Sequence, residues 1–243
     1  MSARVTAATT LRVLQQIRHD PRTIALLLVV PGALLWLLHE LLGDVAFDRL
    51  GAPMLGIFPF ISMFLVTSIA MLRERTSGTL ERLMTMPLAK IDLLAGYGLA
   101  FALLAAVQGL LTSFVAFAFL GLDSAGDPGL IVALAVIDAV LGSSLGLLAS
   151  AFAATEFQAV QFMPALVLPQ ILLCGLLIPR GQMSDWLEAV ASVLPLTFAF
   201  DALDAVSVDG ADLAGVADEI AVLAGMIAVA IALAALTLRR RTA

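Results

Sequence analysis

Few side chains in this sequence combine a reactive type with a useful spacing. The only cysteine, Cys174, and one acid, Asp138, lie inside apolar stretches, while His19 and His39 flank another apolar stretch. A cysteine-based metal cluster needs several thiolates, and two histidines separated by a membrane-length stretch could not share a ligand site. The sequence therefore predicts no metal site and no catalytic residues.

A literal match to the nucleophile motif G-x-S-x-G occurs at residues 142–146. That motif works at a strand–turn–helix junction and needs a histidine later in the chain, but no histidine follows His39. Here the match lies inside an apolar stretch, where two glycines four residues apart favour close packing of helices. We interpret Gly142 and Gly146 as a helix-packing face.

The sequence also lacks a nucleotide-binding loop. Its single lysine, Lys90, stands in P-L-A-K-I-D with no glycine-rich segment before it, whereas a P-loop needs such a segment to hold phosphates. We therefore expect that this chain is not an enzyme, and that any ATP is used by another polypeptide.

The overall composition predicts where these side chains are held. Of 243 residues, 61% are hydrophobic and 13% are charged, and the mean hydropathy is +1.05, whereas soluble domains have about 45–50% apolar and about 25% charged residues. A helix that crosses a membrane needs about 20 apolar residues. The sequence predicts an all-α polytopic membrane protein with six such helices, at residues 24–42, 54–72, 93–120, 130–153, 159–178 and 220–238.

The distribution of basic residues predicts the orientation. Of the 13 Lys and Arg residues, only Arg49 and Arg180 fall on one side of the six spans, and the other 11 fall on the side of both termini. Because basic residues gather in cytoplasmic loops, we expect both termini in the cytoplasm, with the protein in the plasma membrane. The spans leave no block long enough for an ATPase or a nucleic-acid domain, and we expect no nucleic-acid partner.

Three segments outside the spans have amphipathic patterns. Residues 3–20 place apolar side chains at helical spacing, which predicts an interfacial helix within an N-terminal segment 1–23 that precedes a membrane domain 24–243. In the charged loop 73–92, Leu80 and Leu83 share one face of a short helix, which either lies on the membrane or binds a partner protein. At 182–206, two helices too short to span predict a re-entrant segment that dips into the outer leaflet.

Asp138 is the one acidic residue well inside a span, and such residues often have a function. This leaves open a secondary transporter that uses Asp138, although transporters of that kind usually have several such groups and repeated halves. A polytopic intramembrane enzyme is a weaker alternative, because the chain offers no nucleophile–base pair or metal ligands.

Three motifs in order along the chain resemble one transporter family. The segments R-E-R-T-S-G-T-L-E-R-L at 73–83, T-E-F-Q-A-V-Q-F-M-P at 155–164 and L-P-L-T-F-A-F-D-A-L at 194–203 resemble motifs of type-2 ATP-binding cassette export permeases. With six spans and the interfacial helix, the resemblance covers essentially the whole chain. It is nearest to the daunorubicin-resistance-like drug exporters.

The resemblance implies how the chain would meet its ATPase. In this family a coupling helix between the second and third spans, here about 76–86, sits in a groove of the ATPase subunit. The N-terminal helix would be the connecting helix that rests on the same partner. The residues expected to dock are Arg73, Glu74, Arg75, Thr76, Ser77, Gly78, Leu80, Glu81, Arg82 and Leu83.

The resemblance also implies an assembly of two permease chains, identical or related, with two ATPase subunits that bind ATP and Mg. This chain would need no cofactor of its own and would export a hydrophobic drug or a lipid-like substrate. The substrate path would run between the permeases in the bilayer, lined mainly by the second and fifth spans. The side chains expected near it are Phe58, Phe60, Met63, Phe64, Asp138, Gln161, Phe162 and Met163.

Overall fold

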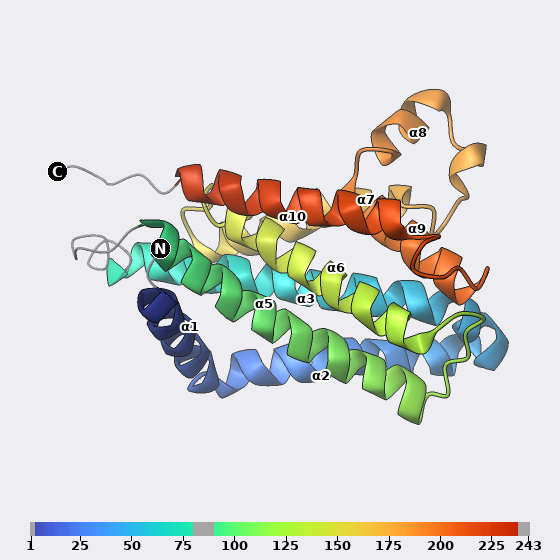
Figure 1. The fold of residues 1–243 in the computed structure, drawn as a ribbon, viewed down its shortest axis with the longest axis horizontal. Coiled ribbons are helices and arrows are strands. Elements are labelled where there is room, and N and C mark those ends of the chain that lie inside the picture. The colour runs from blue at the N-terminus through green and yellow to red at the C-terminus, as the bar shows by residue number, and fades with distance from the viewer. Residues whose placement is uncertain (1–2, 80–89, 238–243) are drawn as a thin grey trace.

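The protein is a bundle of long, roughly parallel and antiparallel helices with one helix across an end (Figure 1). A computed structural model describes residues 3–79 and 90–237. In these residues the helices are α1 (Ala3–Arg18), α2 (Pro21–Leu42), α3 (Asp44–Thr76), α5 (Lys90–Phe114) with a π-helical turn (Val115–Phe119), α6 (Pro128–Ala149), α7 (Glu156–Leu173), a 3-10 turn (Arg180–Gln182), α8 (Asp185–Ala191), α9 (Pro195–Ser207) and α10 (Ala217–Thr237).

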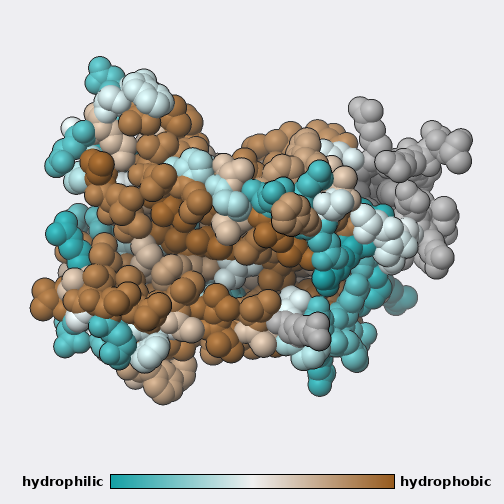
Figure 2. All heavy atoms as spheres, turned by 180° about the vertical axis from the view of Figure 1, so that it is seen from behind, coloured by the Kyte–Doolittle hydropathy of each residue, from teal (hydrophilic) through white to brown (hydrophobic). Residues whose placement is uncertain are grey.

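Six of these helices, among the described residues, are long and apolar enough to cross a membrane. They are α2, α3, α5 with its π-helical turn, α6, α7 and α10, which confirms the predicted fold class. Figure 2 shows the corresponding apolar band, with hydrophilic residues gathered at both ends of the bundle. We refer to these as the α1 end, where α1 lies and α10 finishes, and the α8 end (Figure 1).

The start of α3 corrects one predicted boundary. The apolar stretch predicted a span from residue 54, but α3 begins ten residues earlier, at Asp44, directly after Gly43 with its positive φ of 71°. Polar residues such as Asp48 and Arg49 therefore continue the helix beyond the apolar part. Pro53 and Pro59 lie within this helix, as neighbouring helices in a membrane allow.

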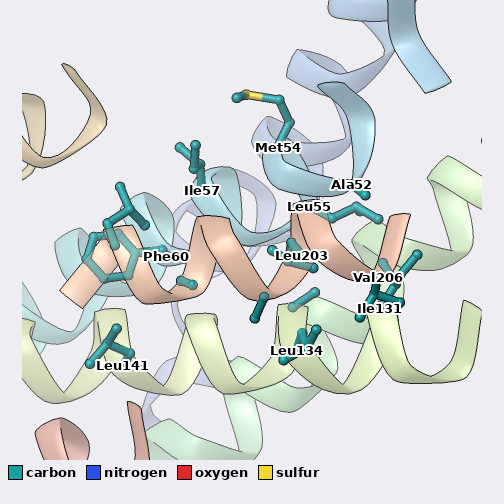
Figure 3. Close-up of a cluster of buried hydrophobic side chains, with 14 of the residues drawn as sticks. Ala52, Met54, Leu55, Ile57, Phe60, Ile131, Leu134, Leu141, Leu203 and Val206 are labelled. Carbon is teal, nitrogen blue, oxygen red and sulfur yellow. The ribbon is translucent and has the colours of Figure 1, made fainter. Parts of the chain in front are cut away.

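Close packing of α3 on α6 forms the centre of the bundle. A Cβ atom at Gly142 would lie 2.9 Å from the Cα of Phe60, and one at Gly146 would lie 3.1 Å from the Cα of Phe64, each still closer to the carbonyl oxygen. Backbone therefore meets backbone at two successive turns, which confirms the helix-packing face. Around this contact lie Leu141, Leu203 and their buried neighbours (Figure 3).

Three of the other spans, α2, α7 and α10, lie at the outside of the single chain. Only 17% of the apolar window is buried in each of α2, α7 and α10, compared with 67% in α3. These three helices therefore present most of their apolar surface away from this chain's core.

The segment between α7 and α10 holds two short helices that differ in their surroundings. α8 and α9 meet at an angle of 86°; α8 stands away from the bundle (Figure 1) and exposes Trp186, whereas Leu196 and Leu203 of α9 are fully buried. The two helices were predicted to behave alike, but α9 belongs to the core. The backbone N–H of Leu196 donates to Oε1 of Gln170 at 3.3 Å, which ties α9 to α7.

Helix α1 buries a face of mixed polarity against the other helices. Its buried side chains are Thr9, Thr10, Val13 and Ile17, whereas Leu11 is exposed. The hydroxyl of Thr10 donates to the carbonyl oxygen of Gly96 in α5 at 3.1 Å. Gly96 of α5 lets Thr9 approach closely, and Val13 and Ile17 pack in one apolar cluster with Leu93 and Tyr97 of α5.

Candidate functional site

A buried ionic network joins three helices at the α1 end. The Glu74 carboxylate of α3 accepts hydrogen bonds from Nη1 and Nη2 of Arg12 at 3.4 and 3.2 Å and from the hydroxyl of Tyr97 at 2.7 Å. Arg12 also bonds the Tyr97 hydroxyl and lies over the aromatic ring, 5.5 Å from its centroid. The network links α1, α3 and α5, which are far apart in the sequence.

Arg12 keeps its charge in this network because its partners offset the cost of burial. Glu74 is only 5% exposed, and a buried carboxylate needs a paired cation and hydrogen bonds to offset its lost hydration. Burial lowers the pKa of the Arg12 guanidinium, but its bonds to Glu74 and attraction to Tyr97 raise it more, so the pKa lies above its ordinary value. Arg12 therefore remains a cation beside Glu74.

The preceding residue, Arg73, joins two further elements. Its Nε and Nη2 donate to the two carboxylate oxygens of Glu156 at 2.8 and 3.0 Å, and Nη1 lies 3.6 Å from Oδ2 of Asp20. Adjacent residues of a helix point about 100° apart, so Arg73 and Glu74 reach different neighbours. The pair between Arg73 and Glu156 is about half exposed, unlike the buried Glu74 network.

Helix termini position the two acids that meet Arg73. Asp20 is the N-cap of α2 and accepts from the backbone N–H of Thr23. Thr155 is the N-cap of α7, where its hydroxyl accepts from the backbone N–H of Gln158 at 3.2 Å, and this places Glu156 in the first turn. Capping preferences thus fix both carboxylates at the same level as Arg73.

The residues predicted to dock on an ATPase fall into two groups. Arg73 and Glu74 are engaged within this chain, and the side chain of Arg75 is partly buried. Thr76 ends α3, Ser77 caps it and Gly78 follows with a φ of 71°. α3 thus continues to the first residue of the predicted coupling helix, about 76–86, most of which lies outside the described residues. The others, Leu80, Glu81, Arg82 and Leu83, lie outside the described residues.

The residues predicted along a substrate path are divided between the core and the surface. Phe60, Met63, Phe64 and Asp138 are at most 1% exposed inside the single chain. Phe58, Phe162 and Met163 are partly buried against the same core, and Gln161 is exposed. The structure brings α3 and α7 together, but none of these eight residues, all of them described, lines the cavity formed by α1, α2, α3 and α5.

Asp138 differs from the acids of the α1 end. Its carboxylate packs against Gly56 of α3, where Leu203 of α9 also lies, and neither oxygen has a hydrogen-bond partner among the described residues. In the described part of the chain, no group of three or more His, Cys, Asp or Glu residues could hold a metal ion.

Sequence reasoning missed several residues of this site. Arg12, Asp20 and Tyr97 were not singled out, and Glu156 was noted only within a motif. A partial signal was present, since Tyr97 is the only tyrosine of the chain and lies one turn inside an apolar stretch. Its partner on another helix could not be read from spacing.

Membrane-length helices around a close-packed centre, with ionic contacts at one end, define a polytopic membrane protein. The family model described as ABC-2 type transporter matches residues 5–207, and the chain belongs to this family. Members of this family form the membrane subunit of a transporter and not its ATPase.

Two relatives are similar in sequence to part of this chain, and both are longer than it. Over 166 residues, 68% of this chain, it is 26% identical to ABC transporter G family member 20 of Dictyostelium discoideum, of which 23% is covered. Over 136 residues, 56% of this chain, it is 28% identical to the probable multidrug ABC transporter permease YbhR of Escherichia coli (strain K12), of which 37% is covered. The matched segments thus make up well under half of each relative.

Proposed function

We propose that this chain is the membrane subunit of an ATP-binding cassette exporter, driven by separate ATPase subunits, and that it exports hydrophobic drug-like or lipid-like molecules. The observation that carries the proposal is the bidentate pair between Arg73 and Glu156. It joins the first and second of the three family-like motifs, directly before the predicted coupling helix 76–86. Membership of the ABC-2 family and the multidrug permease among the relatives support it.

The α1 end would transmit movement from the ATPase to the spans. Movement of segment 76–86 would act on the last turn of α3. Arg73 joins this turn to α7, and Glu74 joins it to α1 and α5. ATP can move the permease between inward-open and outward-open states only if the ATPase contacts differ between those states. Exposed ion pairs suit this role, because water compensates them when they separate.

The complete assembly would contain two permease chains and two ATPases. The weakly buried faces of α2, α7 and α10 supply apolar surface for a second permease, identical or related, and for lipid. ATP and Mg would be bound by the ATPase subunits, with no cofactor in this chain. We place the α1 end in the cytoplasm and the protein in the plasma membrane, since nearly all its basic residues fall on that side.

A secondary transporter that uses Asp138 is the alternative function. The observation in its favour is the buried carboxylate without a hydrogen-bond partner, because such groups in membranes often bind protons or ions. In that case, segment 76–86 would need no ATPase.

The test is co-purification of the chain with candidate ATPase subunits, followed by measurement of vanadate-sensitive ATP hydrolysis. We expect the unaltered chain to recover an active ATPase, and the double variant Glu81→Arg with Leu83→Asp to lose it while still inserting into the membrane. The matched control is Glu188→Arg with Val190→Asp on exposed α8, which should recover the ATPase normally.

Two results would overturn this proposal. One is an unaltered chain that recovers no ATPase with any candidate subunit. The other is equal loss of the ATPase in both double variants, because loss through the α8 variant would indicate general damage rather than docking. Transport driven by an ion gradient and abolished by Asp138→Asn would then favour the alternative.

A further inference from the structure

One partly buried cation at the α1 end has no counter-charge in the described part of the chain. Arg75 is the last residue but one of α3, and its Nε and Nη2 atoms are buried without a hydrogen-bond partner. Among the described residues it forms no ion pair, whereas Arg12, Arg73 and Arg180 each pair with a carboxylate. The unpartnered edge of Arg75 is the edge that binds a carboxylate through two bonds, as Nε and Nη2 of Arg73 bind Glu156.

This arrangement is unfavourable for the chain by itself. A charged group that is buried loses its interaction with water, and only an opposite charge with hydrogen bonds offsets that loss. For Glu74 the offset comes from Arg12 and Tyr97. For Arg75 the described residues supply none, so an anionic partner would stabilise this end of α3.

Arg75 lies beyond the packed centre of the bundle. Helices α3 and α6 run in the same direction, since Gly142 and Gly146 of α6 contact Phe60 and Phe64 of α3 in turn. From the second contact α6 continues for 149 − 146 = 3 residues, whereas Arg75 is 75 − 64 = 11 residues further along α3. At 1.5 Å per residue, Arg75 is about 12 Å beyond the end of α6, on the part of α3 that extends past α6 at the α1 end (Figure 1).

The face of α3 that carries Arg75 is directed into the bundle. Met71, four residues earlier and therefore on the same face, is fully buried and belongs to an apolar cluster with Val13 of α1 and Leu93 of α5. A lipid or a second permease approaches the bundle from its sides, whereas a protein that covers the α1 end approaches this face along the bundle axis. The position of Arg75 therefore favours the partner proposed for that end, the ATPase.

We propose that Arg75 forms a bidentate ion pair with an aspartate or glutamate of the ATPase subunit. The inference rests on the proposed function and names the chemistry of one contact in it. Arg73 and Glu74 are engaged within this chain, so Arg75 is the charged residue available to the ATPase among the described residues predicted to dock. Its side chain is only partly buried and can turn toward a partner.

An ion pair at this position would act on α3 directly. Arg75 belongs to the helix itself, and the two residues before it join α3 to α7 and to α1 and α5. Movement of an ATPase carboxylate would thus reach three other helices without passing through segment 76–86.

The first test replaces the guanidinium with an amine. Lys90 is the only lysine of the chain, so Arg75→Lys in a Lys90→Arg background carries a single side-chain amine. The complex of this variant with the ATPase is treated with a water-soluble carbodiimide, which joins an amine to a carboxylate in contact with it, and the joined peptides are identified by mass spectrometry. We expect a link from position 75 to an acidic residue of the ATPase. The matched control, Arg73→Lys in the same background, should be linked to Glu156 of its own chain.

A second measurement separates docking from a structural role. Arg75→Met removes the charge and keeps a long apolar side chain. Because it removes an unpaired buried cation, the chain alone should unfold at the same or a higher temperature, while its affinity for the ATPase should fall about tenfold or more. Arg73→Met removes a paired cation, so it should lower the unfolding temperature and change the affinity less.

The ion pair is wrong if an active complex gives no link from position 75 to the ATPase, or only a link to an acid of the same chain. It is also wrong if Arg75→Met lowers the unfolding temperature and leaves the affinity unchanged. Unchanged affinity with weaker retention of anionic lipid would assign the guanidinium to a lipid phosphate instead. These results leave the export function standing, because the recovered complex still hydrolyses ATP. An unaltered chain that recovers no ATPase would contradict both proposals.

Discussion

Two buried carboxylates on neighbouring spans have opposite surroundings. Glu74, at the α1 end of α3, is bonded by Arg12 and Tyr97. Asp138, in the middle of α6, packs against Gly56 and has no hydrogen-bond partner among the described residues. The first acid connects helices through a charge network, and the second lies where helices are joined by packing alone.

This difference indicates where the protein can move. In the centre, Gly142 and Gly146 let the backbones of α3 and α6 touch, and such contacts have no alternative arrangement that avoids a void or a clash. At the α1 end, Arg73 and Glu156 are half exposed and can exchange partners with water at little cost. The α1 end is therefore the part of α3 suited to transmit a change, while the centre acts as a rigid unit.

The largest expected effect is at the rigid centre. Gly142→Leu places a side chain against the backbone of Phe60 and should destabilise the protein by about 3 kcal/mol or more, the upper range for overpacking. Thermal unfolding in detergent measures it. The control is Gly225→Leu on α10, which meets nothing within 4 Å and should be tolerated. Equal behaviour of the two variants would mean that α3 and α6 are not in backbone contact.

The next effect concerns the buried network. Glu74→Ala leaves Arg12 without its carboxylate and should cost about 2–3 kcal/mol, less than the about 3–5 of a fully buried pair, because Arg12 is 34% exposed. Hydrogen exchange should also become faster in α1. Glu188→Ala on exposed α8 is the control and should change neither measurement. Unchanged exchange in α1 would show that Glu74 does not hold this helix.

A smaller effect is expected for the exposed pair. A double-mutant cycle of Arg73→Gln and Glu156→Gln should give a coupling energy of about 0.2–1 kcal/mol, and it should decrease at about 1 M salt because exposed charges are screened. The stability of the four proteins is compared at low and high salt. A coupling that salt does not weaken would indicate a pair shielded from water, contrary to its exposure.

The smallest effect should come from Asp138. Asp138→Asn has nearly the same shape and removes no hydrogen bond, so we expect a change of about 1 kcal/mol or less. Glu74→Gln makes the same chemical change at the other carboxylate and is the matched comparison, with a larger expected cost. If Asp138→Asn costs as much as Glu74→Gln, then Asp138 interacts with a cation or proton, and the secondary-transport alternative gains support.

The sequence predicted features that depend on local pattern. Six spans follow from apolar length, and the packing face of Gly142 and Gly146 follows from their spacing. It did not predict that α3 starts at Asp44, because a polar turn continues a helix when its caps and neighbours permit. It also did not predict the hydrogen bond from Thr10 of α1 to the backbone of α5.

What the sequence alone determined was the class of fold, since the cost of burying polar backbone in a bilayer leaves apolar stretches of this length one structure, the helix. It also determined which residues can cap a helix or let two helices touch. Only the tertiary structure decided which charges meet. Arg12 and Glu74 are 62 residues apart, and Arg73 and Glu156 are 83 apart. Their partners, and the cavity beside them, depend on how six separate helices pack, and no local pattern encodes that arrangement.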